Sequence, residues 1–306
     1  MSGTLHLDHG TLDWPAIVVH GGAGTYQRLT DDTPGLSARL TASVDAAVDA
    51  GWEVLARPGD AGDPLVAVIA AVASLEADGG FNAGRGSVPT TGGSVEMDAG
   101  VMEQTGRSGA VACITGHSPV RAAEAVLSLG GPVLLAGPNA DAFASSRGVP
   151  RLEPLHAGRG AVADPTPMEG PVSPEGTVGA VAVSADGRFA AATSTGGRSG
   201  QIPGRVGDTP IPGAGFWAQP GCAVSATGAG EAFLMAGFCR LVGVRHAAGD
   251  PLTGALSSAL DAVAGYGGDG GGIALGRDRT WAAAFNTRGM ARGVRHAGGR
   301  RSRLLG

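Results

Sequence analysis

Apolar residues recur along the chain at two different periods, which predict both helices and strands. Helical spacing of apolar positions predicts helices over residues 36–55, 65–77 and 120–129. An Asp-Pro pair precedes the second of these helices and a Ser-Pro pair precedes the third, and both pairs are typical of a helix N-terminus. These three segments therefore need an apolar surface on which to bury one face.

Short apolar or alternating runs predict strands in both halves of the chain. The first half contains such runs at residues 16–20, 94–102 and 109–115, and the second half has a hairpin signal, with an Asp-Gly turn between two apolar runs, that begins at Thr177. Beyond it we expect a strand and loop at 221–230, a helix at 231–242, a helix after Asp250-Pro251, and a strand pair at 270–287. This alternation predicts an α+β fold in which helices cover two packed sheets.

Glycine and proline mark the expected breaks in this pattern. The first strand should end in a tight loop at residues 21–24, which are Gly-Gly-Ala-Gly. Residues from about 155 to 176 are rich in proline and glycine without periodicity and read as a flexible linker. The basic stretch from about 295 to 306 reads as a solvated tail. A flexible segment thus meets a rigid sheet at Gly176-Thr177.

Composition and charge exclude several classes of function. The net charge is -5 and the basic residues form no stripe outside the C-terminal stretch, so we expect no nucleic-acid partner. No segment has the pattern of a signal peptide or of a membrane span, which predicts a cytoplasmic protein without a membrane partner. Three cysteines without CxxC spacing predict neither a disulfide framework nor a zinc site.

The chain contains no lysine, which limits the amine bases available for catalysis. An α-amino group is the remaining amine, and an N-terminal threonine carries that amine beside its own hydroxyl nucleophile. Thr177 would acquire this group if the preceding bond were cut, and Gly176 can adopt the strained backbone that such a cut needs. The alternative from these residues alone is an ordinary strand threonine that follows a loop glycine.

Several long motifs together resemble one family. They are GAVACITGHSPVRAAEAV at 109–126, GTVGAVAVSADGRFAAATSTGG at 176–197, GRVGDTPIPGAG at 204–215 and AVSATGAGEAF at 223–233, with HGGAG and FNAGRGSVPTTGGSVEMDAGVM before them. Over residues 16–293 the chain resembles plant-type L-asparaginases, also called isoaspartyl peptidases. The resemblance implies a four-layer αββα N-terminal nucleophile hydrolase, cleaved into an α subunit of residues 1–176 and a β subunit of 177–306, and commonly a dimer of αβ units.

The same resemblance implies a set of site residues. Thr177 matches the nucleophile, Thr195 the threonine that hydrogen-bonds it, and Thr227 with Gly228 the oxyanion hole. Arg205 and Asp208 match the clamp for the α-carboxylate and α-ammonium of an aspartyl substrate, although an isolated Arg-x-x-Asp pair would read as a surface salt bridge. The binding site implied by the matching motifs consists of Arg205, Val206, Gly207, Asp208, Thr227, Gly228, Ala229 and Gly230. No catalytic cofactor is implied.

A structural sodium ion is also implied by the resemblance. It would be bound by the backbone carbonyls of Leu75, Glu76, Asp78, Phe81, Ala83 and Arg85, in a loop to which Gly79-Gly80 gives extra freedom. Side chains at such a site leave little trace in a sequence.

Other residues carry a second interpretation. His20 resembles a packed, hydrogen-bonded histidine more than a base, and Glu96 and Asp98 resemble paired structural carboxylates more than a glycosidase pair. Residues 198–203, RSGQIP, depart from the family pattern and alter the pocket rim. A glycosylasparaginase-like amidase, or a binding protein on the same fold that never matures, remains an alternative function.

Overall fold

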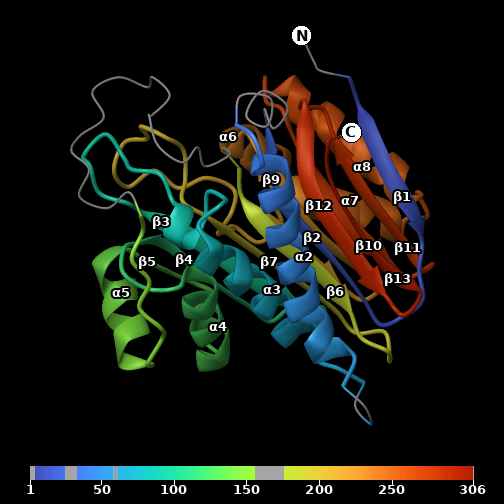
Figure 1. Ribbon diagram of the computed structural model, residues 1–306, viewed down its shortest axis with the longest axis horizontal. Coiled ribbons are helices and arrows are strands. Elements are labelled where there is room, and N and C mark those ends of the chain that lie inside the picture. The colour runs from blue at the N-terminus through green and yellow to red at the C-terminus, as the bar shows by residue number, and fades with distance from the viewer. Residues whose placement is uncertain (1–3, 25–32, 58, 60, 156–175, 306) are drawn as a thin grey trace.

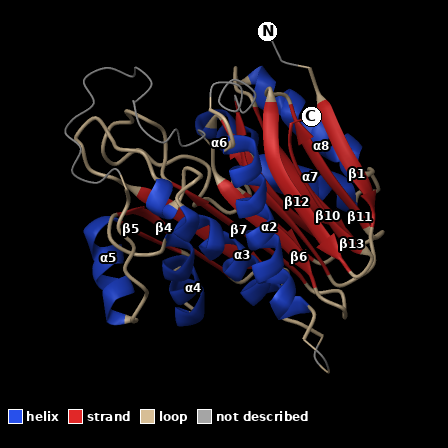
Figure 2. Ribbon diagram, in the orientation of Figure 1, coloured by secondary structure: helices blue, strands red, loops and turns tan. Residues whose placement is uncertain are grey.

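The computed structural model describes residues 4–24, 33–57, 59, 61–155 and 176–305. It confirms an α+β architecture, with helices on both sides of the strands (Figures 1 and 2). The described helices are α2 (Leu36–Leu55), α3 (Pro64–Asp78), α4 (Pro119–Leu129), α5 (Gly137–Ser146), α6 (Gly230–Ala236), α7 (Phe238–Ala247) and α8 (Leu252–Gly265). Most of the linker expected before Thr177 lies outside the described residues.

The described strands form two sheets. The larger has eight strands, in the order β13 (Gly299–Leu305), β12 (Gly289–His296), β2 (Ala16–Gly24), β6 (Val178–Val183), β7 (Phe189–Thr195), β3 (Met97–Glu103), β4 (Ser108–Ile114) and β5 (Leu134–Ala136). The smaller has five, in the order β1 (His6–Thr11), β11 (Thr280–Phe285), β10 (Gly270–Gly276), β9 (Cys222–Gly228) and β8 (Phe216–Gln219). Every pair is antiparallel except β4 with β5.

Three apolar clusters hold these elements together. Helices α2, α3 and α4 bury one face against the larger sheet, the two sheets pack on each other, and α7 and α8 cover the outer face of the smaller sheet. Strand β2 shows why a central strand is apolar throughout, because Ile17 and Val19 face the helices while Val18 faces the other sheet. The strand run AIVV is therefore continuous rather than alternating.

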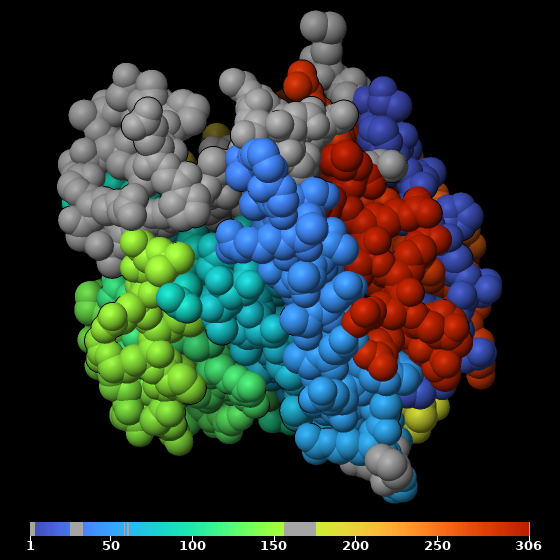
Figure 3. Space-filling model, in the orientation of Figure 1, coloured from blue at the N-terminus to red at the C-terminus, as the bar shows by residue number. Residues whose placement is uncertain are grey.

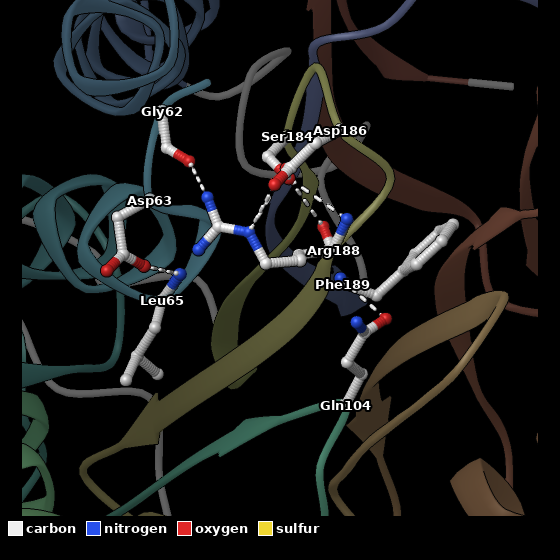
Figure 4. Close-up of polar contacts among 8 residues, drawn as sticks. All are labelled: Gly62, Asp63, Leu65, Gln104, Ser184, Asp186, Arg188 and Phe189. Atoms are coloured by element: carbon white, nitrogen blue, oxygen red, sulfur yellow. Dashed lines mark hydrogen bonds and ion pairs between the residues drawn. The ribbon is translucent and has the colours of Figure 1, made fainter. Parts of the chain in front are cut away.

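The hairpin predicted at Thr177 is present, and its turn is fixed by side chains. Strands β6 and β7 pair from Val178 opposite Ser194 to Val183 opposite Phe189. At the turn Arg188 donates from Nε to Asp186 and from Nη2 to the Gly62 carbonyl at 2.7 Å, which ties the hairpin to the segment before α3 (Figure 4). The distant end of β6 is thereby anchored.

Two helix termini differ from the sequence expectation. Ser118 does precede α4, but its hydroxyl donates to Glu76 at 2.5 Å rather than capping its own helix, and the Glu76 carboxylate accepts from Val120 N instead. The single helix expected at 231–242 is divided into α6 and α7, because Gly237 adopts a left-handed conformation with φ of 58°. The last residues of the predicted helix, 238–242, therefore belong to a second helix, α7.

The glycine run and the C-terminal stretch also differ from expectation. Residues 21–24 continue strand β2 instead of forming a tight loop, because β12 pairs with them through Gly289 opposite Gly24. Residues 299–305 are strand β13 and not a solvated tail. In Figure 3 the C-terminal strands adjoin α2 on one face of the molecule. Three arginines of this stretch form ion pairs with carboxylates of α2 and β1, namely Arg295, Arg300 and Arg301.

The best buried of these ion pairs joins Asp8 of β1 to Arg292 of β12. Arg292 donates from Nε to Asp8 at 3.0 Å, and the side chains are 4% and 11% exposed. Arg301 of β13 contacts the other Asp8 oxygen. One carboxylate therefore links three strands from the two ends of the chain.

We expect Asp8→Asn to lower the free energy of unfolding by about 2–3 kcal/mol, because it leaves the Arg292 charge buried without a counter-charge. Asp13→Asn is the matched control, since its partner Arg279 and Asp13 itself are 57% and 72% exposed, and it should cost less than about 1 kcal/mol. Urea unfolding of both variants measures the difference, and equal losses would contradict this account.

Candidate active site

Thr177 immediately precedes β6, between two neighbouring strands of the larger sheet. The register continues so that Thr177 lies opposite Thr195 of β7 on one side and Gly22 of β2 on the other. Thr195 in turn lies opposite Asp98 of β3. The Thr177 side chain is 6% exposed. The sequence-predicted pair Thr177 and Thr195 are thus direct cross-strand neighbours.

The hydroxyl partner of Thr177 is Thr209 rather than Thr195. The two oxygens, Oγ1 of Thr177 and Oγ1 of Thr209, lie 3.2 Å apart, whereas Thr195 Oγ1 accepts from Gly197 N at 3.2 Å. Thr209 is held in place by Thr193, whose hydroxyl donates to the Thr209 carbonyl at 3.0 Å. Sequence reasoning missed Thr209, although it directly follows the clamp residue Asp208.

Gly176 occupies a backbone conformation that suits glycine. Its φ is 150°, and a Cβ at this position would lie 2.9 Å from the Cα of Gly22. Any other residue before Thr177 would therefore meet both backbone strain and a clash with β2. The structure supplies a reason for glycine at the predicted cleavage point.

Thr227 and Gly228 approach the site from the smaller sheet. They end β9, and Thr227 Oγ1 accepts from Ala23 N at 3.2 Å. A hydroxyl that accepts in this way still has its hydrogen to donate. A Cβ on Gly228 would lie 2.4 Å from the Asp269 carbonyl, so β9 and β10 can approach closely only with glycine there.

A pocket of about 560 Å³ opens over these residues. Of the predicted site residues, its lining includes Gly176, Thr177, Thr195, Arg205, Asp208, Gly228, Ala229 and Gly230. Three others lie beside it: Thr227 is fully buried, Gly207 packs against the Arg205 guanidinium, and the Val206 side chain is exposed. The pocket brings segments from both predicted subunits to one place.

Arg205 is oriented by a carboxylate that sequence reasoning missed. Its Nε and Nη2 donate to the two oxygens of Glu231, each at 2.9 Å, and Gln201 accepts from Nη1 at 3.4 Å. The Arg205 side chain is only 14% exposed, and it lowers the pKa of Glu231 to about 2. The structure therefore does not contain the solvated surface salt bridge between Arg205 and Asp208 that an isolated Arg-x-x-Asp pair would suggest.

Two buried carboxyl groups lie near Arg205. Burial raises the pKa of Asp208 and of Asp98 to about 7 each, and Arg205 offsets part of that shift. Asp98 accepts from Cys113 N at 2.8 Å. Asp208 Oδ2, in contrast, has no hydrogen-bond partner among the described residues, although it is buried and its residue lines the pocket. A buried carboxylate oxygen without a partner can accept a hydrogen bond from a bound cation such as an ammonium group.

His20 and Glu96 have structural partners. His20 is fully buried, its Nε2 lies 2.8 Å from Ser225 Oγ, and burial lowers its pKa to about 3. It is therefore neutral near pH 7 and joins β2 to the smaller sheet. Glu96 accepts from Gly204 N at 2.6 Å and holds the loop that carries Arg205.

The loop after α3 is hydrogen-bonded to residues 196 and 197 beside the pocket. Asn82 donates from Nδ2 to the Gly197 carbonyl at 2.7 Å, and its own carbonyl accepts from Gly196 N. Around it the chain folds so tightly that a Cβ on Gly86 would lie 2.0 Å from the Phe81 carbonyl, and one on Gly84 would lie 2.5 Å from the Glu76 carbonyl. Backbone carbonyls thus lie close to side-chain-free positions in this loop, and those of Phe81, Ala83 and Arg85 accept hydrogen bonds from the backbone N–H groups of residues 83, 86 and 155.

A Ser-His-Asp network also exists, away from the pocket lining. Ser145 Oγ lies 3.0 Å from His117 Nε2, and His117 Nδ1 lies 3.2 Å from Asp141. Asp141 also accepts from Thr115 N and Gly116 N. The network fastens α5 to the end of β4. Within the described ranges no group of three or more His, Cys, Asp or Glu residues could hold a metal ion, and no helix there is long and apolar enough to cross a membrane.

Comparison with known proteins places this site in a family. A family model described as asparaginase matches residues 13–163 and 156–304. A plant-type L-asparaginase of Pyrobaculum calidifontis is 38% identical, over 90% of this chain and 95% of its own length. An isoaspartyl peptidase/L-asparaginase of Danio rerio is 38% identical over 90% and 91%, and an isoaspartyl peptidase of Escherichia coli is 37% identical over 92% and 93%.

The pocket thus places a buried hydroxyl beside an arginine and a buried carboxyl group, which are groups that can act on a small polar substrate. The chain belongs to the asparaginase family of hydrolases.

We expect Asp208→Asn to stabilise the protein at pH 8. The raised pKa means that the folded state keeps its proton between about pH 4 and pH 7 while the unfolded state loses it, so the free energy of unfolding falls as pH rises through that window. The variant should raise the unfolding midpoint by about 2–4 °C at pH 8 and change it little at pH 4.

Asp186→Asn is the control of opposite sign. The hydrogen bond from Ser184 and the Arg188 charge lower the Asp186 pKa, so that substitution should lower the midpoint at pH 8. Thermal unfolding at both pH values compares the two variants. A loss of stability in Asp208→Asn at pH 8 would show that the ionised Asp208 carboxylate is not destabilising.

Proposed function

We propose that the protein cuts its own chain between Gly176 and Thr177 and then hydrolyses L-asparagine or β-aspartyl peptides with the threonine so exposed. The proposal rests on the structure of the Gly176–Thr177 junction. Thr177 has a buried hydroxyl on the lining of the pocket, and the residue before it adopts a conformation that suits glycine. The names of the relatives, L-asparaginase and isoaspartyl peptidase, support the two substrate classes.

The first step is an acyl shift within the chain. The Thr177 hydroxyl attacks the Gly176 carbonyl carbon, the peptide nitrogen leaves as the α-amine of Thr177, and water hydrolyses the resulting ester. The products are residues 1–176 with a free carboxylate and residues 177–306 with a free amine. Thr209, whose hydroxyl is 3.2 Å from that of Thr177, orients the attacking oxygen.

Substrate hydrolysis repeats this chemistry on an external amide. The Thr177 hydroxyl passes its proton to its own α-amine and attacks the side-chain carbonyl of an aspartyl unit, forming a tetrahedral intermediate. Ammonia or an amino acid leaves with a proton, and water then releases aspartate from the ester. Thr227 and Gly228 are the donors proposed for the intermediate's oxyanion, with the Thr227 hydrogen available because its oxygen accepts from Ala23 N.

The clamp accounts for recognition of the aspartyl unit. Arg205 is held by Glu231 through Nε and Nη2, and its Nη1, which makes only a long hydrogen bond of 3.4 Å to Gln201 among the described residues, faces the substrate α-carboxylate in this proposal. Asp208 offers a buried carboxylate oxygen with no described partner to the α-ammonium. Val206, Gly207, Ala229 and Gly230 complete the proposed binding site through their backbone.

The proposed fold class is the αββα N-terminal nucleophile hydrolase. The order of packed elements supports it, since helices, the larger sheet, the smaller sheet and helices follow one another with an apolar cluster at each contact. The order also accounts for the position of the site, because Thr177 before β6 of the larger sheet and Gly228 at the end of β9 of the smaller sheet line the same pocket.

We expect Thr177→Ala to abolish both cleavage and turnover, because it removes the hydroxyl that both steps require. Thr177→Ser is the matched control and should retain both at a reduced rate, since it keeps the hydroxyl. A denaturing gel with N-terminal sequencing detects cleavage, and release of ammonia from L-asparagine or of leucine from β-Asp-Leu measures turnover. Full activity in an uncut chain would refute the proposal.

We also propose a sodium ion in the loop after α3, bound by the carbonyls of Leu75, Glu76, Asp78, Phe81, Ala83 and Arg85. The ion would supply positive charge that holds these oxygens together, and so fix Asn82 beneath residues 196–197. It takes no part in the chemical steps.

Sodium chloride should therefore raise the unfolding midpoint by about 2–4 °C relative to choline chloride at equal ionic strength. Gly86→Ala, whose Cβ would meet the Phe81 carbonyl, should remove this difference. Differential scanning calorimetry of the purified enzyme gives both values. Equal midpoints of the parent protein in the two salts would exclude the ion.

A further inference from the structure

The pocket has a second wall that neither the clamp nor the nucleophile uses. It is lined by Thr4, His6, Thr287 and Arg288, from the start of β1 and the turn between β11 and β12. His6 is stacked on Phe285 with the ring centroids 5.0 Å apart, so β1 is packed firmly against this turn. The packing of β1 therefore holds this wall in place beside the pocket.

The strand order places this wall and the clamp on opposite sides of Thr177. Strand β6 lies between β2 and β7 in the larger sheet. On the β7 side, Thr195 lies opposite Asp98, whose pKa is influenced by the Arg205 charge. On the β2 side, Gly24 lies opposite Gly289, the residue after Arg288. An amide bond placed over Thr177 would thus have one end at the clamp and the other facing Arg288.

Arg288 differs from the other two arginines of the pocket in its charge partners. Arg205 and Arg198 both lie near Glu231, at 2.9 Å and 3.8 Å. Arg288 is exposed and forms no ion pair with any described residue. A guanidinium group that is not already paired retains its full set of donors for an incoming anion.

The two substrate classes differ in the group that would face Arg288. L-Asparagine loses ammonia, whereas a β-aspartyl dipeptide loses an amino acid that carries its own α-carboxylate. Thr177 and Arg288 line the same pocket of about 560 Å³, and the additional residue of a dipeptide extends about 3.5 Å beyond the scissile amide. It carries its carboxylate across the pocket toward the wall that bears Arg288, and an arginine forms paired hydrogen bonds with a carboxylate.

We propose that Arg288 binds the α-carboxylate of the leaving amino acid, and that the enzyme therefore prefers β-aspartyl dipeptides with a free C-terminus. This inference rests on the proposed function and names the substrate class within it. Arg288 is a specificity residue and takes no part in bond cleavage. It acts on the dipeptide alone, because ammonia offers it no negative charge.

The test compares three substrates on the mature enzyme: β-Asp-Leu, its C-terminal amide β-Asp-Leu-NH2, and L-asparagine. For the parent protein, kcat/KM should be about 5- to 10-fold higher for the acid than for the amide, since a solvent-accessible charged contact is worth roughly that factor. In Arg288→Gln this ratio should fall to near 1, mainly through a higher KM for the acid. L-Asparagine hydrolysis and the two-band gel pattern report that the variant is folded and mature.

Arg198→Gln is the matched control, because Arg198 lines the same pocket on the clamp side. Like Arg288→Gln, it removes one positive charge from the pocket, but it should leave the ratio of kcat/KM for the acid to kcat/KM for the amide unchanged. A fall of the ratio in Arg198→Gln as large as in Arg288→Gln would show a general charge effect and overturn the assignment, as would a parent protein that does not distinguish acid from amide. A parent protein inactive on all three substrates would instead refute the proposed function.

Discussion

The position of one threonine between two strands governs the rest of the site. Thr177 immediately precedes β6, and the continued antiparallel register sets Gly22 on one side and Thr195 on the other. A shift of one residue would turn the side chain to the opposite face of the sheet, into the cluster beneath α3. The anchored turn at Arg188 and the apolar faces of β6 hold that register, so the hydroxyl always meets the pocket.

The electrostatics of the site follow from placing three acids, two of them buried, around one arginine. Asp98, Asp208 and Glu231 surround Arg205, and only Glu231 satisfies it with two direct hydrogen bonds. Burial of Asp208 without a described partner at Oδ2 is unfavourable for the free protein. In the proposed function the same oxygen accepts from the substrate ammonium group, so that stability and the proposed recognition are opposed at this residue.

The second wall of the pocket, which carries Arg288, bears on substrate selectivity. Both walls of the pocket carry arginine, but Glu231 compensates the charge on the clamp side only. In the proposed binding mode, an aspartyl unit brings one carboxylate to Arg205, and a dipeptide brings a second to Arg288. Whether a neighbouring carboxylate balances an arginine, more than the number of arginines, therefore determines which part of the pocket attracts an anionic substrate.

Local pattern determined much of this protein, because periodicity and turn chemistry act over a few residues: helices α2 and α3, the hairpin at Thr177 and the glycine before it are all readable from the sequence. Motif resemblance also pointed to Arg205 and Asp208, which both line the pocket. The tertiary structure alone decided that the Thr177 hydroxyl lies at hydrogen-bonding distance from Thr209, that Glu231 holds Arg205, and that residues 299–305 form a strand. These depend on contacts between segments far apart in the chain, which sequence periodicity does not encode.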